Sequence, residues 1–144
     1  MEENDTIRLL RECDAGIKMG TSAINEVTEQ AQNQQLANIL RRSKGAHEQL
    51  DRELRTLLDK YHDDGKQPPM MAKGMSWLKT NTKLAMDASD ETVADLITDG
   101  CNMGVKSLHR YLNQYKDADN SAKDICRRII ELEEELVSDM HEYL

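Results

Sequence analysis

The sequence predicts an all-α fold, an antiparallel bundle of four helices. Four stretches carry apolar residues at alternating spacings of three and four, which is the pattern of a helix with one buried face. Polar segments separate these stretches, and the two halves of the chain repeat a common motif. With 144 residues the chain is long enough to bury a substantial core, so we expect a single domain over residues 1–144.

The first two helices are expected at residues 5–31 and 36–61. The polar residues 32–35 between them form a break short enough to return the chain antiparallel. Gly65 is expected to take the left-handed position after the second helix, and Pro68 prevents that helix from continuing. The expected buried stripes are Leu10, Cys13, Ile17, Gly20, Ile24, Val27 and Ala31 in the first helix, and Leu36, Leu40, Ser43, His47, Leu50, Leu54, Leu57 and Tyr61 in the second.

The third and fourth helices are expected to form a second hairpin. Ser89 can cap the third helix, because its hydroxyl oxygen can accept a hydrogen bond from a backbone N–H of the first turn. Residues 116–120 form a polar turn before the fourth helix. The expected buried stripes are Val93 or Ala94, Ile97, Cys101, Gly104, Leu108, Leu112 and Tyr115 in the third helix, and Ala122, Ile125, Ile129, Leu132, Leu136, Met140 and Tyr143 in the fourth.

The connector at residues 66–88 is rich in methionine and locally basic. We expect it to be partly helical. It is much longer than an ordinary turn between helices, so it can cross along the side of the bundle and let the third helix run parallel to the second. More often such a segment covers its own bundle, but it also forms a candidate surface for a partner. The residues of this surface are Met71, Met75, Trp77, Leu78, Lys73, Lys79 and Lys83.

A short motif, G-x-x-M-G followed by a small residue and an aliphatic one, occurs at residues 16–24 and again at residues 100–108. A shift of 84 residues superposes the first helix on the third, and a shift of 86 superposes the second on the fourth. We interpret this as a duplicated helical hairpin. Each glycine inside a helix costs about 1 kcal/mol relative to alanine, so we expect these glycines to let the first and third helices cross closely, near Gly20 and Gly104. The full set is Gly16, Gly20, Gly100 and Gly104.

Two helical hairpins joined by one long crossover is the arrangement of ferritin-like bundles. The chain resembles the ferritin-like superfamily, and its second half resembles uncharacterised bacterial ferritin-like bundle proteins. The residues that carry the resemblance are Met75-Ser76-Trp77 in the connector, Asp95 to Gly104 on the third helix, and Leu132-Glu133-Glu134 on the fourth. For active members of the superfamily, the resemblance implies a di-metal carboxylate centre with oxidase or iron-storage chemistry.

The ligands of such a centre are largely missing. It needs a glutamate from each of two helices and a Glu-x-x-His from each of the other two. No glutamate stands three residues before any of the four histidines, His47, His62, His109 and His141. The expected stripes of the first and third helices carry no carboxylate near their middle. We therefore predict no cofactor, and expect His109 and His141 to be exposed.

One polar pair remains on the expected stripes. His47 and Glu133 occupy equivalent positions under the shift of 86 residues, so the internal symmetry brings them close. One interpretation is a reduced site for iron, manganese or zinc, with His47, Glu133 and Cys101 as ligands. The other, which we favour, is a hydrogen-bonded pair that fixes the register of the helices.

The composition narrows the function classes. A net charge of −8 argues against nucleic acid as a partner, because that binding needs a basic surface. The acidic start of the chain does not resemble a secretory or transit peptide, and the sequence has no stretch of about 18 apolar residues that could span a membrane. The three cysteines lack a metal-binding spacing. We therefore expect a cytoplasmic protein with reduced cysteines.

These observations favour a non-catalytic structural or interaction module that associates with itself or with another protein. A metal-binding or redox protein with a degenerate site is the first alternative. The second alternative is a bundle whose connector binds either a membrane surface or a partner. Of these two, the membrane surface is the less favoured.

Overall fold

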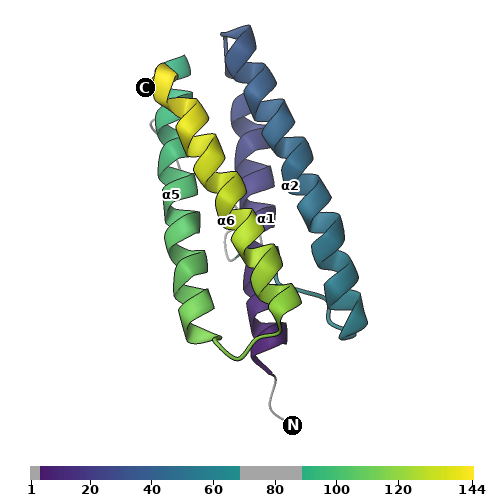
Figure 1. The fold of residues 1–144 in the computed structure, drawn as a ribbon. Coiled ribbons are helices and arrows are strands. Elements are labelled where there is room, and N and C mark those ends of the chain that lie inside the picture. The colour runs from purple at the N-terminus through teal and green to yellow at the C-terminus, as the bar shows by residue number, and fades with distance from the viewer. Residues whose placement is uncertain (1–3, 69–88) are drawn as a thin grey trace.

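In a computed structural model the described residues of the chain form four long α-helices and one short 3-10 helix (Figure 1). The structure describes residues 4–68 and 89–144. Within these ranges it contains no strand. The candidate partner surface at residues 71–83 lies outside them. The elements are α1 (Asp5–Thr28), α2 (Gln34–Lys60), α5 (Asp90–Gln114), α6 (Asn120–Met140) and η1 (His141–Tyr143).

Hydrogen bonds at the two ends of the bundle fix the directions of the helices. At one end the turn before α6 meets the start of α1 and the end of α2: the Asp119 N–H donates to Thr6 Oγ1 (2.7 Å), and the Tyr61 hydroxyl donates to the Asp119 carboxylate (2.6 Å). At the other end the Asp90 carboxylate accepts the N–H groups of Gln32 (2.7 Å) and Asn33 (3.0 Å). Therefore α2 and α5 run in the same direction, opposite to α1 and α6 (Figure 1).

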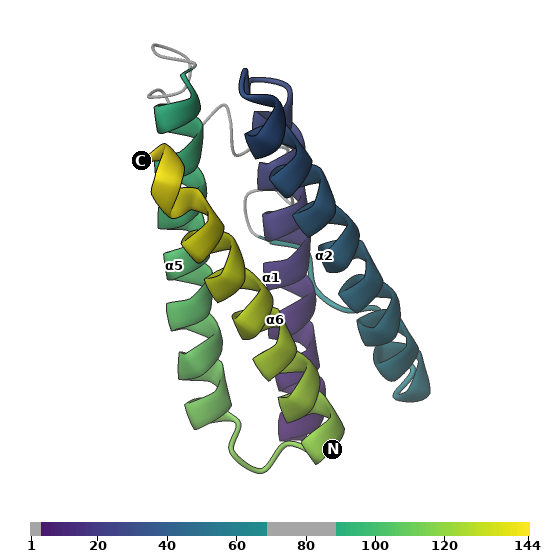
Figure 2. The same cartoon turned by 45° about the horizontal axis from the view of Figure 1, so that its top comes forward.

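The four helices pack as two hairpins, α1 with α2 and α5 with α6. Between the hairpins, α1 lies beside α5 and α2 beside α6, while α6 also contacts α1 across the bundle (Figure 2). Among the described residues, no helix combines the length and the apolarity needed to cross a membrane.

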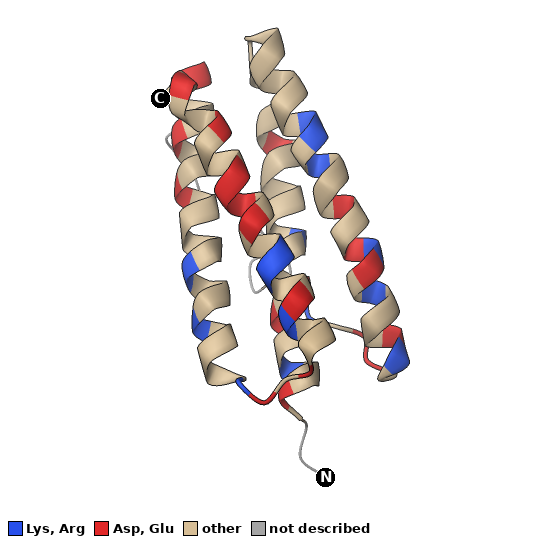
Figure 3. Ribbon diagram, in the orientation of Figure 1, with Lys and Arg blue, Asp and Glu red and all other residues tan. Residues whose placement is uncertain are grey.

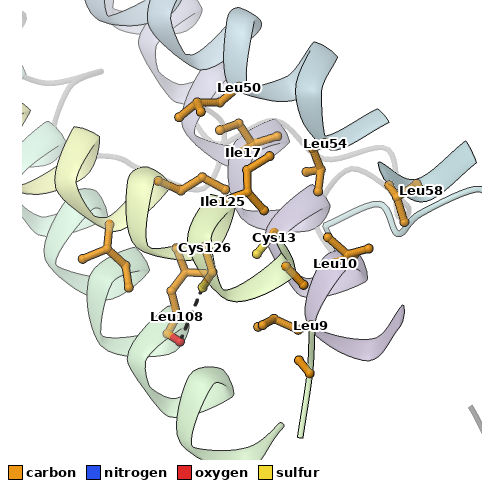
Figure 4. Packing of buried hydrophobic residues seen from close by; sticks show 14 residues of the cluster. Leu9, Leu10, Cys13, Ile17, Leu50, Leu54, Leu58, Leu108, Ile125 and Cys126 are labelled. Carbon is orange, nitrogen blue, oxygen red and sulfur yellow. Dashed lines mark hydrogen bonds between the residues drawn. The ribbon is translucent and has the colours of Figure 1, made fainter. Parts of the chain in front are cut away.

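The buried apolar side chains form two clusters along the bundle axis. One cluster, at the end where α1 begins, includes Leu10, Cys13, Leu54 and Ile125 (Figure 4). The other, toward the opposite end, includes Leu36, Leu40 and Met140 among its members. All three cysteines are buried, and none forms a disulfide. Because each cluster draws on all four helices, the layer between them lies in the middle of the bundle.

The helix ends follow local sequence signals, with one correction. The side chains of Asn4, Asn33 and Ser89 cap the starts of α1, α2 and α5. However, α2 ends at Lys60, and His62, not Gly65, takes the left-handed position directly after the helix, with φ 55°. The N–H groups of His62 and Asp63 donate to the carbonyl oxygens of Asp59 and Leu58, as in a Schellman motif, and this satisfies carbonyl groups that have no partner within the helix. Gly65 is also left-handed, at φ 85°.

The chain after α2 is fastened to α1 by the fully buried carboxylate of Asp14. This carboxylate accepts hydrogen bonds from Lys18 Nζ (2.8 Å), from the N–H of Lys66 (2.9 Å) and from Arg55 (3.4 Å). A Cβ at Gly65 would collide with it. The glycine therefore lets the backbone come close enough for Asp14 to bind it.

Figure 3 shows a run of acidic residues along α6. Glu131, Glu134 and Glu135 are exposed there, whereas Glu133 in the same run is buried. One glutamate of the run is thus separated from the others by helical periodicity and directed into the bundle.

Candidate functional site

A cavity of about 440 Å³ lies between α1 and α5; we call it the α1–α5 groove. His47 of α2 and Glu133 of α6 also line it, from the opposite side of the bundle. Its other lining residues are mostly apolar or small. They include Ala15, Gly16, Met19, Gly20 and Ala23 of α1, and Leu96, Ile97, Gly100, Cys101, Met103, Gly104, Ser107 and Leu108 of α5.

The repeated glycines explain why the groove exists. The two motifs place small residues on the facing sides of α1 and α5, where larger side chains would fill the space. At Gly20 a Cβ would lie 2.9 Å from His47 Nε2 and 3.1 Å from Glu133 Oε1. At Gly104 it would lie 3.9 Å from Glu133 Oε2. Gly20 therefore makes room for a pair of buried polar side chains.

This use of the glycines differs from the expected close helix crossing. At Gly16 a Cβ would be in ordinary contact with a Leu108 side-chain atom, at 3.9 Å. Gly100 is exposed, and a Cβ there would meet no described atom within 4 Å. Among the described residues, Gly100 thus has no neighbour from α1 against which it packs, and it lines the groove instead.

The His47–Glu133 pair lies in the middle layer, between the two apolar clusters. The two side chains are 86 residues apart in the sequence, and the distance from His47 Nε2 to Glu133 Oε1 is 3.0 Å. His47 is 0 % exposed and Glu133 is 6 % exposed. The structure thus brings together the two residues that the shift of 86 residues relates.

The surroundings of the imidazole indicate its charge state. Nδ1 of His47 lies 2.7 Å from the Ser43 carbonyl oxygen, which can only accept, so this nitrogen donates. Nε2 faces the carboxylate, and donation there as well makes the ring an imidazolium. Burial lowers the pKa of His47, but the hydrogen bond and charge of Glu133, together with the Ser43 carbonyl, raise it above the ordinary value.

Cys101 of α5 is the third sequence candidate, and it lies beside Glu133. Burial raises the pKa of its thiol, and the charge and hydrogen bond of Glu133 raise it further. The thiol therefore stays protonated at neutral pH, whereas metal ligation needs the thiolate. Among the described residues, no group of three or more His, Cys, Asp or Glu side chains is placed to hold a metal ion. His109 and His141 are exposed, as expected.

One end of the groove carries polar residues that the sequence analysis did not single out. Glu12, Lys66 and Tyr111 line this end, and Lys66 Nζ donates to Glu12 Oε1 at 2.6 Å. Met103 of α5 also lines the groove and is 70 % exposed. The sequence contains a signal for this wall of the groove, because Glu12, Gly16 and Met19 follow each other at helical spacing. It was missed because these residues lie beside the core-facing stripe and not on it.

Comparisons of the chain with models of protein families, with curated proteins and with solved structures find no match. The resemblance to the ferritin-like superfamily therefore stays a prediction, whereas the all-α bundle of four long helices is described by the structure.

Alanine substitutions at Gly20 and Gly100 should have opposite effects on stability. Gly20→Ala should lower the free energy of unfolding by about 1–3 kcal/mol, the usual cost of overpacking, because the new methyl group pushes on His47 and Glu133. Gly100→Ala should raise it by up to about 1 kcal/mol, because the position is open and alanine is the better helix former. Urea unfolding followed by circular dichroism measures both changes. Gly45→Ala, at another exposed glycine with open space, is the control and should resemble Gly100→Ala. Equal effects at all three positions would contradict the assignment.

The raised pKa of His47 predicts a defined pH dependence. A group whose pKa is higher in the folded than in the unfolded chain stabilises the fold fully below its unfolded pKa, about 6.5 for histidine. This stabilisation should be lost as the pH rises through the folded-state pKa. The difference in unfolding free energy between the wild type and His47→Gln should therefore be constant below about pH 6.5 and shrink above it. His141→Gln, at an exposed histidine, should leave the pH profile unchanged. Parallel profiles for the wild type and His47→Gln would rule out the linkage.

Proposed function

We propose that this protein is a non-catalytic binding module and that the α1–α5 groove is its binding site. The observation that carries the proposal is the composition of the groove, whose walls are mostly apolar or small while two buried polar side chains converge on one point. Cavities of a few hundred Å³ with apolar walls and few polar groups are the usual form of ligand sites. The groove therefore offers buried contact area and a small number of directional contacts.

The chemistry of the groove supports binding more than catalysis. A general base needs an acceptor free to take a proton from a substrate, and a nucleophile needs an activating neighbour. Here both ring nitrogens of His47 already face acceptors, and burial together with Glu133 keeps Cys101 as a thiol. These interactions hold the polar groups in place and leave neither His47 nor Cys101 activated for reaction.

We also propose that the bundle is ferritin-like, with a duplicated hairpin and a long crossover. Two features support this. The second and third long helices, α2 and α5, run in the same direction. In addition, His47 and Glu133 are equivalent under the internal repeat and meet in the middle layer, with Gly20 and the equivalent Gly104 beside them. In this proposal the glycines of α1 and α5 stand where active members of the superfamily carry carboxylates.

A groove-filling substitution tests the binding site. The wild type should bind the neutral apolar dye Nile red with an increase in dye fluorescence. Gly104→Leu should weaken this binding at least about tenfold, because its side chain would occupy the groove that Gly104 lines. Gly45→Leu is the matched control, because Gly45 is an exposed glycine on α2 that does not line the groove. Circular dichroism should show that both variants fold. Equal dye binding by Gly104→Leu and the wild type would refute the proposal, as would a wild type that binds no dye.

A metal-binding protein is the second candidate, and the contact between His47 and Glu133, with Cys101 beside Glu133, is the observation that favours it. Metal analysis of protein purified without chelators separates the two proposals. We expect less than one equivalent of iron, manganese or zinc, because Cys101 is held as a thiol and His47 as an imidazolium. A stoichiometric metal that is lost in His47→Ala and Glu133→Ala would overturn the non-catalytic binding module in favour of this candidate.

A further inference from the structure

The carboxylate of Glu133 has acceptor capacity that its protein partners do not use. A carboxylate can accept about four hydrogen bonds. In Glu133, Oε1 accepts from His47, and Cys101 supplies a weak thiol donor. The side chain is almost fully buried, yet it lines the groove. An acceptor with remaining lone pairs therefore faces the apolar space between α1 and α5.

The charges around this acceptor limit what can bind to it. The positive His47 is in direct contact with the negative Glu133, so the pair is neutral as a unit. On α5 the neighbouring titratable group is the neutral thiol of Cys101, and on α1 the neighbouring residue is Gly20. An anionic head would meet lone pairs, and a cationic head would lose its hydration with no net charge to compensate it. A neutral donor meets neither penalty.

The walls limit the shape of the rest of the ligand. Along α1 the groove is lined by Ala15, Gly16, Gly20 and Ala23 among others, and the facing part of α5 contributes Gly100 and Gly104. These small residues on both sides leave an apolar stretch of the groove, apart from the polar residues at its one end. An unbranched alkyl chain can fill such a space and gains free energy in proportion to the apolar area that it buries.

We propose that the α1–α5 groove binds a neutral amphiphile, an unbranched alkyl chain whose single hydroxyl group donates a hydrogen bond to the free lone pairs of Glu133. The inference rests on the proposed function, because it names the ligand class of the same groove. No covalent step is involved, and the ligand leaves unchanged.

The test compares four molecules that share one alkyl chain and differ in the head: dodecanol, its methyl ether, dodecanoate and dodecylamine. Each is added to the complex of the wild type with Nile red, the alcohol and the ether below their solubility limits and the two charged molecules below the concentration at which they form micelles, and the displacement of the dye is measured. Dodecanol should displace the dye at a concentration at least about tenfold lower than the methyl ether, because a hydrogen bond to a charged group contributes at least that factor. Tighter binding of dodecanoate or dodecylamine than of dodecanol would overturn the proposal.

A double variant tests the role of the polar pair. His47→Leu with Glu133→Leu replaces the buried pair by apolar residues without leaving an unpaired charge. It should still bind Nile red, and dodecanol and the methyl ether should then displace the dye equally. A preference for dodecanol that persists in this variant would refute the assignment to Glu133. Should the variant fail to fold, the head-group series on the wild type still decides the proposal.

The failures of the two proposals are distinguishable. If the wild type binds Nile red but all four heads compete equally, the ligand class is wrong and the binding site stands. If nothing binds, both are wrong. One further variant replaces Met71, Met75, Trp77 and Leu78 by serine. If Nile red binds to this variant and not to the wild type, the groove of the wild type is filled by the chain itself. That result would overturn the proposed ligand.

Discussion

The contact between His47 and Glu133 is the interaction on which the middle of the bundle depends. It lies between two apolar clusters and joins α2 to α6, one helix from each hairpin. A buried ion pair is weak evidence for stability by itself, because removing both charges from water offsets much of their attraction. Its geometric effect is clearer. A slipped register of the two hairpins would separate the imidazole from the carboxylate and bury an unpaired charge, so we infer that the pair favours the observed register.

The glycines follow from the same contact. An imidazole and a carboxylate in the middle layer take up space that a side chain of α1 would otherwise fill. Gly20 leaves this space free because it has no side chain. On α5, Gly104 lies near the other carboxylate oxygen without touching it closely. The pair and the small residues together leave α1 and α5 separated by a groove. The contact that holds α2 and α6 together is therefore linked to the space between the other two helices.

Much of this arrangement could be predicted from the sequence, because helical periodicity and an internal repeat are local patterns. The four helices follow from spacing, and the contact of His47 with Glu133 was expected from the shift of 86 residues that we interpret as a repeat. The left-handed position of His62 was not predicted, because glycine is the usual residue at that position and Gly65 follows three residues later. The groove could not be predicted either. Spacing shows that Gly100 lies on a helix, but whether the neighbouring helix touches it depends on packing across the whole layer.

The buried glutamate of α6 shows how one position can serve both the fold and a ligand. Its neighbours Glu131 and Glu134 are exposed and interact with water, so they add solubility and little specificity. Glu133 is buried, and its charge is compensated by His47 at one oxygen. Because His47 compensates the charge at one oxygen of Glu133, the glutamate side chain is fixed in one orientation. The other oxygen therefore stays at the groove and does not need a second cation. A site that is held in place before binding loses less conformational entropy when a ligand arrives. The interaction that sets the register of the hairpins is thus the same one that would preorganise the groove for a neutral donor.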